Sequence, residues 1–114
     1  MNECLFCKIV KKEIPADIVY EDVKIMAFKD INPAAAVHVL IVPKEHISAV
    51  VDIDNTNSEI IGYIFAKVNE IAAGLGIKEK GFRVIVNCGK DGGQVIYHLH
   101  FHLLGGQKLG KLVG

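Results

Sequence analysis

The sequence has no tryptophan and no excess of either charge. Its 114 residues include 13 basic and 13 acidic side chains, which give a net charge of zero and form no long run of one sign. A surface that binds a nucleic acid polymer or an anionic membrane usually carries a concentrated basic patch. The sequence therefore predicts neither of these partners.

Long hydrophobic runs are also missing. The longest apolar stretch covers residues 34–42, is interrupted by His38, and is far shorter than the roughly 18 residues that a membrane-spanning helix needs. The first residues, MNECLFCKIVKKEIP, lack the layout of a signal peptide. We therefore expect a cytoplasmic protein.

Cysteine is scarce, and its count is odd. Two of the three cysteines are spaced as Cys4-x-x-Cys7, an arrangement that fits no simple disulfide framework in a reducing compartment. The pair could bind a metal, take part in redox chemistry, or supply two small core residues to a helix. A redox role is disfavoured because the pair does not follow a strand as it does in a thioredoxin-like unit.

Length and hydrophobicity predict one domain over residues 1–114. Hydrophobic residues make up 51% of the chain and the mean hydropathy is +0.33, which is enough to fill a core and leave an apolar patch for a second subunit. A homodimer is therefore expected.

Two helices are predicted, a short one over residues 3–12 and a long one over residues 58–75. The short helix ends before Pro15, because a proline disfavours helical geometry in the residue that precedes it. The long helix has apolar residues at the 3.6-residue period. Its expected end signals are a capping box formed by Thr56 and Glu59 and left-handed conformations at Gly74 and Gly76.

Five strands are expected around these helices, at residues 18–21, 23–30, 36–43, 82–87 and 95–104. Successive strands with an inserted helix, in place of a regular alternation, predict the α+β class with a mainly antiparallel sheet of about five strands.

Three of the five histidines alternate along the segment HLHFHLLGG, residues 98–106. Because strand side chains alternate between two faces, His98, His100 and His102 would share one face of a strand. The other face, with Leu99, Phe101 and Leu103, suits a core.

Three interpretations of these histidines are open. Structural histidines would need a separate hydrogen-bond partner each. A zinc ion could use two of them at most, because positions 98 and 102 of a strand lie about 13 Å apart. Covalent catalysis at phosphorus suits imidazole, whose pKa lies near neutrality. The loop Asp91–Gln94 favours this last interpretation, since its two glycines could present amides to an anion.

The motif resembles the His-Φ-His-Φ-His-Φ-Φ signature of the histidine triad (HIT) superfamily. Three further segments, CLFCKIVKKEIPADIVYED, MAFKDINPAAAVHVLIVPKEHIS and NCGKDGGQVIYHLHFHLLGG, are similar in order to the Hint branch of purine nucleotide-binding phosphoramidases. The Gly105-Gly106 pair that follows the triad favours this branch over dinucleoside polyphosphate hydrolases of the Fhit type.

The resemblance implies an α+β homodimer whose sheets join across a two-fold axis, and an enzyme that cleaves purine nucleoside phosphoramidates and related nucleoside monophosphate conjugates. His100 would attack the α-phosphorus and form a covalent nucleotidyl intermediate. His102 would contact the phosphate, and His38 would hold His100 in its reactive tautomer. No cofactor would be required for the chemistry. The alternative is a protein that binds purine nucleotides without catalysis, as a scaffold.

The resemblance also implies a nucleotide site. Asp30 would accept the ribose hydroxyls, and Phe28 and Ile31 would lie near the purine. The remaining implied residues line the phosphate side: Asn87, Gly93, Gln94 and Val95. At position 95 the family usually has a hydroxyl residue, so a side-chain hydrogen bond is lost in this chain, whereas a backbone contact would survive.

A structural zinc site is the second expectation. His46 and His98 would complete a Cys2His2 tetrahedron with Cys4 and Cys7. The pattern is similar to that of bacterial relatives that bind zinc. This use of His98 leaves His100 and His102 for phosphate.

Overall fold

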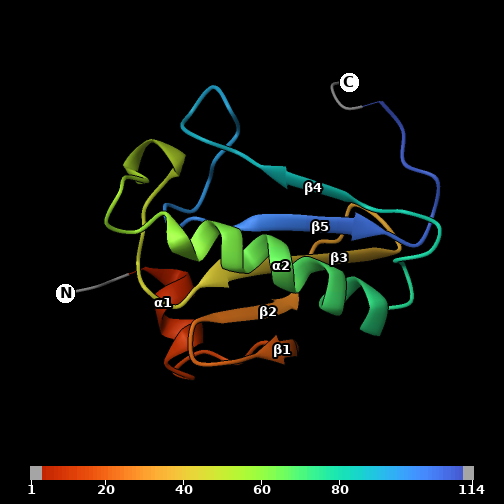
Figure 1. The fold of residues 1–114 in the computed structure, drawn as a ribbon, viewed down its shortest axis with the longest axis horizontal. Helices are drawn as coiled ribbons and strands as arrows, with labels where there is room; N and C mark the ends of the chain where they lie inside the picture. Colours follow the sequence, from red (N-terminus) through yellow and green to blue (C-terminus); the bar gives the residue numbers. More distant parts are fainter. Residues whose placement is uncertain (1–3, 112–114) are drawn as a thin grey trace.

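The computed structural model describes residues 4–111 (Figure 1). Its helices are α1 (Leu5–Val10), a single 3-10 turn (Val50–Asp52) and α2 (Glu59–Gly74). Its strands are β1 (Ile18–Glu21), β2 (Ile25–Lys29), β3 (Val37–Pro43), β4 (Arg83–Val86) and β5 (Phe101–Gly105). The predicted α+β class is confirmed.

The five strands form one antiparallel sheet in the order β1-β2-β3-β5-β4. Figure 1 shows α2 lying across one face of this sheet, and α1 at the end of the sheet where β3 finishes. The central strand β3 pairs with β2 on one side and β5 on the other. Any side chain of β3 therefore has strand neighbours in both directions.

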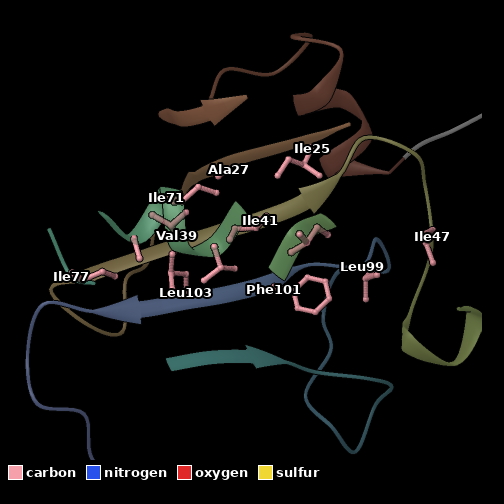
Figure 2. Close-up of a cluster of buried hydrophobic side chains, with 13 residues drawn as sticks. Ile25, Ala27, Val39, Ile41, Ile47, Ile71, Ile77, Leu99, Phe101 and Leu103 are labelled. Carbon is pink, nitrogen blue, oxygen red and sulfur yellow. The ribbon is translucent and has the colours of Figure 1, made fainter. Parts of the chain in front are cut away.

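The core has two parts because β3 is buried on both faces. Val39 and Ile41 point to α2 and pack with Leu103 and Phe101 of β5 (Figure 2). On the other face, Leu40 belongs to a second cluster whose further members include Met26, Phe28 and Val42 of the sheet and Phe6 and Ile9 of α1. Burial of each such side chain stabilises the fold by about 1.5–3 kcal/mol.

The end signals predicted for the long helix are partly wrong. Gly76 has a φ of +77°, as predicted, but Gly74 is the last helical residue and has no positive φ. The capping box does not form, because the helix begins at Glu59 with Ser58 as its N-cap, two residues later than a Thr56 cap requires. The Thr56 hydroxyl instead donates to Asp54 Oδ1 at 2.6 Å.

The other boundaries agree with the prediction to within two residues, apart from the last strand. The short helix covers Leu5–Val10 in place of residues 3–12, and Glu3 lies outside the described residues. The last strand covers only Phe101–Gly105 in place of residues 95–104. Residues 95–100 lie outside the strand and bend at residues 96–98, and the Leu99 N–H donates to the Ile47 carbonyl at 2.6 Å. The prediction that all three histidines lie on one strand is therefore wrong.

Within residues 4–111, no helix combines the length and the apolar composition that crossing a membrane would require.

The hairpin between β1 and β2 is held by the carboxylate of Asp22. The carboxylate accepts hydrogen bonds from the Lys24 and Ile25 amides at 2.7 and 3.0 Å, from the Tyr20 hydroxyl at 2.8 Å, and from the Tyr63 hydroxyl of α2. Desolvation raises the pKa of Asp22, but these four hydrogen bonds outweigh it and hold the pKa well below its usual range. Asp22 therefore attaches the first hairpin to the long helix.

Replacing Asp22 with asparagine is expected to lower the free energy of unfolding at pH 7 by about 2 kcal/mol, since hydrogen bonds to a charged acceptor are lost. The native pKa lies below the unfolded value of about 3.9, so this stabilisation is present above that pH and is lost as the pH falls below it. Urea unfolding of both proteins at pH 7 and pH 3 measures the effect. An equal difference at the two pH values would contradict this account.

Candidate functional site

A cleft of about 670 Å³ lies on the face of the sheet opposite α2. Its floor includes Phe28 of β2, Leu40 of β3 and His102 of β5, and α1 forms one wall. Eight of the residues predicted from the sequence line it: Phe28, Asp30, Ile31, Asn87, Gly93, Val95, His100 and His102. The fold thus gathers residues from β2 to β5 at one opening.

Gln94 and His38, also predicted for the site, are buried beside the cleft and do not line it. The amide nitrogen of Gln94 donates to the carbonyls of Ser48 and Ile96 at 2.8 and 3.1 Å, and its oxygen accepts from the Gly89 amide at 3.0 Å. The side chain of Gln94 therefore holds the loop that follows β4.

The glycine loop is closed by its own hydrogen bonds. The Gly93 amide donates to the Lys90 carbonyl at 3.1 Å, and the Gln94 amide donates to the Gly89 carbonyl at 2.9 Å. A Cβ atom at Gly92 would lie 2.3 Å from the Cys88 carbonyl oxygen, so this position requires glycine. The loop is tight as predicted, but the Gly93 and Gln94 amides are used within it and are not turned toward an anion.

Hydrogen bonds to the backbone decide the tautomer of His38. Its Nδ1 lies 3.0 Å from the Ala34 nitrogen, and since a backbone N–H can only donate, Nδ1 accepts. The ring proton is therefore on Nε2, which lies 2.9 Å from His102 Nδ1 and 3.4 Å from Asp30 Oδ2. His102 Nδ1 must accept in turn, so the proton of the neutral His102 ring is on Nε2, available to a ligand in the cleft.

His38 was expected to orient His100, and this prediction is wrong. His38 contacts His102, whereas His100 Nδ1 lies 2.8 Å from the carbonyl oxygen of His98. A carbonyl can only accept, so Nδ1 of His100 carries the proton and Nε2 keeps its lone pair. His100 is buried among protein atoms and lines the cleft, so its Nε2 is an unprotonated nitrogen at a ligand-sized opening.

Burial decides the charge of His102. Burial, with smaller contributions from His100 and His38, lowers the pKa of His102 to about 4, and the Asp30 carboxylate opposes this shift. His102 is therefore neutral at pH 7 and offers one hydrogen-bond donor to the cleft.

Among residues 4–111, two groups of side chains have the composition of a metal site, and their hydrogen bonds distinguish them. One is Asp30, His38 and His102. Because His38 Nδ1 accepts from the Ala34 amide, its Nε2 must hold a proton and cannot give a lone pair to a metal. We call this group the relay: His38 Nε2–H donates to His102 Nδ1, and Asp30 Oδ2 lies 3.4 Å from the same His38 nitrogen.

The other group, Cys4, Cys7, His46 and His98, is the predicted ligand set. Its four donor atoms all lie within 4.8 Å of one another, and the four closest distances between them are 3.2 to 3.4 Å. Zinc bonds of about 2.0 to 2.3 Å in a tetrahedron would separate the donors by about 3.3 to 3.8 Å. The spacing therefore fits a tetrahedral ion.

The tautomers of this cluster also fit a metal. His98 Nε2 donates to the Pro43 carbonyl at 2.8 Å, which leaves the Nδ1 lone pair aimed at the two sulfur atoms. His46 Nε2 lies 3.1 Å from the Ser48 hydroxyl and its Nδ1 faces the cluster. Cys4 is the N-cap of α1, and its sulfur accepts a hydrogen bond from the Cys7 amide at 3.3 Å. The cluster is a possible metal-binding site by geometry and by donor chemistry.

Comparison with known proteins identifies the family. A family model described as the HIT domain matches residues 11–109. The chain is 46% identical to Protein HitA of Neisseria gonorrhoeae over 92% of this chain and 97% of that protein. It is 43% identical to the purine nucleoside phosphoramidase of Escherichia coli K12, over 98% of this chain and 94% of that protein.

The chain belongs to the HIT family. A HIT family hydrolase from Clostridium thermocellum has the same fold, with 52% identity, a TM-score of 0.95, and coverage of 99% of this chain and 98% of that one. A HIT family hydrolase from Legionella pneumophila aligns with a TM-score of 0.94 and 44% identity, over 98% of this chain and 100% of that one. The resemblance inferred from the sequence is thus confirmed, and the protein is a HIT family hydrolase.

The sequence analysis missed the apolar wall of the site in this HIT protein. Leu5, Phe6 and Ile9 of α1 line the cleft, and Leu40 of β3 forms part of its floor. Phe6 and Ile9 are three residues apart on a helix, so they share a face that had to bury against something. That spacing was visible in the sequence, but which surface it covers depends on where α1 docks.

Because the native pKa of His102 is about 4 and the ordinary value is 6.5, the unfolded chain binds more protons between these values. We therefore expect the free energy of unfolding to fall as the pH is lowered from 6.5 to 4. His102→Asn should reduce this acid dependence, which urea unfolding at pH 6.5, 5 and 4 measures. Parallel pH profiles for the two proteins would show that His102 is not protected from protonation.

Proposed function

We propose that this HIT protein cleaves purine nucleoside phosphoramidates and related nucleoside monophosphate conjugates through a covalent nucleotidyl intermediate on His100. The observation that carries the proposal is the hydrogen bond from His100 Nδ1 to the His98 carbonyl, which leaves Nε2 as a lone pair in the cleft. Support for the substrate class comes from the related phosphoramidase of Escherichia coli.

In the first step, His100 Nε2 attacks the α-phosphorus. The new bond joins nitrogen to phosphorus, and the phosphoramidate bond to the amine breaks. The leaving nitrogen takes a proton from solvent water and departs as the free amine. His102 Nε2–H donates to a phosphate oxygen as negative charge develops there. The proton that remains on His100 Nδ1 stays bonded to the His98 carbonyl, which favours the positive charge that the ring acquires.

In the second step, water attacks the phosphorus of the intermediate. The water oxygen bonds to phosphorus and gives one proton back to the solvent, which balances the proton taken by the amine in the first step. The bond between phosphorus and His100 Nε2 breaks, the nucleoside monophosphate leaves, and the Nε2 lone pair is restored. The site needs no metal for either step, because the nucleophile and the donors are all imidazoles. The hydrolysis is a double displacement with one ring as the nucleophile.

The nucleoside would occupy the apolar end of the cleft. The Phe28 ring is buried in the floor, whereas Ile31 is almost fully exposed at the rim. Asp30 Oδ1 already accepts from the Asn32 amide at 2.8 Å, so its carboxylate is held in place to receive ribose hydroxyls. The same carboxylate contacts His38, which connects the sugar position to the relay that serves His102.

We also propose that the cluster of two cysteines and two histidines holds one structural zinc ion. Zinc would supply rigidity here and no chemistry, because four protein ligands fill a tetrahedron. A reducing compartment keeps such thiolates available, which favours a cytoplasmic location.

A homodimer is the third part of the proposal. β4 is an edge strand of the sheet, and Val86 at its end is partly exposed. Phe65 of α2 is half-exposed next to Phe101, the residue paired with Val86. These apolar side chains on one edge favour burial against a second copy. Sedimentation at micromolar concentration tests this, and a monomer would contradict it.

The enzyme activity is tested with an adenosine monophosphate amine phosphoramidate. The wild-type protein should release adenosine monophosphate, and His100→Ala should lower the rate by at least about a thousandfold, since the nucleophile is removed. Val95→Ser is the matched control within the cleft and should retain the activity. Binding of the monophosphate without turnover would support a non-catalytic nucleotide-binding protein.

Zinc is tested with the double variant Cys4→Ser and Cys7→Ser. The purified wild-type protein should contain about one zinc per chain, and the variant should contain none and melt at a lower temperature. At free zinc a thousand times its dissociation constant, binding contributes about 4 kcal/mol to stability. The variant should keep measurable activity because His100 and His102 remain. Wild-type protein without stoichiometric metal, or unchanged melting, would show that the cysteines are core residues.

A further inference from the structure

The helix α1 contacts both the Cys/His cluster and the cleft. Cys4 at its N-cap and Cys7 within it face the metal-type cluster. Phe6 lies between these two cysteines in the sequence and lines the cleft together with Ile9. The backbone on each side of Phe6 therefore belongs to, or leads directly to, a cysteine of the cluster.

Phe6 packs directly on the nucleophile. Its ring centroid lies 5.1 Å from that of His100 with an angle of 87° between the planes, which is an edge-to-face contact. On another side it meets Phe28 at 5.4 Å and 71°. Phe6 is almost fully buried, so its ring has little room to move and limits the tilt of the His100 ring.

The cluster reaches His100 by a second route. His98 is a cluster residue, and its carbonyl oxygen is the acceptor for His100 Nδ1. Phe6 also contacts the His98 ring, at 6.0 Å between centroids. The hydrogen bond selects the nitrogen that is protonated, and the Phe6 contact restricts the plane of the ring. Both are needed to aim one lone pair at a phosphorus atom.

We propose that Phe6 is a positioning residue for His100 and that the Cys/His cluster acts on the reaction through it. This inference rests on the proposed function, in which His100 is the nucleophile. In this proposal the Cys/His cluster affects the reaction as well as the stability of the fold, because the cluster fixes α1, which carries the Phe6 ring. The expected consequence is a slower attack on phosphorus, with little change in nucleotide affinity, when the Phe6 ring is removed.

The test compares Phe6→Leu with Val42→Ala. Val42 belongs to the same apolar cluster but does not line the cleft, so its variant reports the effect of general destabilisation. Single-turnover formation of the nucleotidyl intermediate should slow between about tenfold and about 100-fold in Phe6→Leu, as for a small misplacement of a reacting group. The dissociation constant of adenosine monophosphate should change less than about twofold, and Val42→Ala should alter neither. If Phe6→Leu does not fold, Phe6→Met replaces it.

A second measurement is independent of turnover. The Nδ1–H proton of His100 should give a slowly exchanging NMR signal in the wild-type protein and exchange faster in Phe6→Leu, but not in Val42→Ala. If the wild-type protein has no activity, the proposed function fails while this signal still tests the placement of His100. An unchanged signal, a weaker nucleotide affinity with a normal rate, or equal losses in both variants would each overturn the role of Phe6.

The link to the cluster is tested by a double-mutant cycle. In the background of Cys4→Ser and Cys7→Ser, the Nδ1–H exchange should already be faster, and adding Phe6→Leu should slow the reaction by less than it does in the wild-type protein. Fully additive effects would show that the cluster does not act through Phe6.

Discussion

The site depends on one constraint, which is that backbone groups decide where the histidine protons are. A backbone amide can only donate and a carbonyl can only accept, so each contact with an imidazole selects a tautomer. The Ala34 amide does this for His38, the Pro43 carbonyl for His98, and the His98 carbonyl for His100. In the proposed function, one residue type thereby supplies a metal ligand, a nucleophile and a hydrogen-bond donor.

The central strand β3 supplies most of these contacts. His38 lies within it, Pro43 ends it, and its register with β5 places Leu40 opposite His102 and Leu104 opposite His38. His38 and His102 are thus diagonal neighbours on one face, which is the distance at which long side chains meet across a sheet. The other face of β3 packs under α2 and fixes the strand. Core packing on one face therefore determines the geometry of the relay on the other.

The sequence was sufficient to predict the class of fold and two groups of candidate side chains that lie together in the structure. The spacing of His98, His100 and His102 and the composition around Cys4 and Cys7 both concern local patterns, and local patterns are visible in a sequence. The partner of His38 was not predictable in the same way, because the choice between His100 and His102 depends on the register of β3 against β5. The start of β5 was missed for a similar reason, because the alternation of side chains begins at residue 95 whereas strand pairing begins only at Phe101.

The apolar wall of the cleft shows the same limit. Phe6 could be recognised from the sequence as a buried helix residue, but its contact with His100 depends on the position of α1 at the end of β3. Long-range docking of this kind leaves no periodic signal. It becomes visible only when residues from opposite ends of the chain are placed together.

The central claim is the assignment of a tautomer to each histidine. Long-range proton–nitrogen NMR, recorded at a pH at which the imidazoles are neutral, measures these tautomers directly. The account predicts a proton on Nδ1 of His100 and on Nε2 of His38, His98 and His102. A His100 ring protonated on Nε2 would have no lone pair in the cleft and would contradict the account.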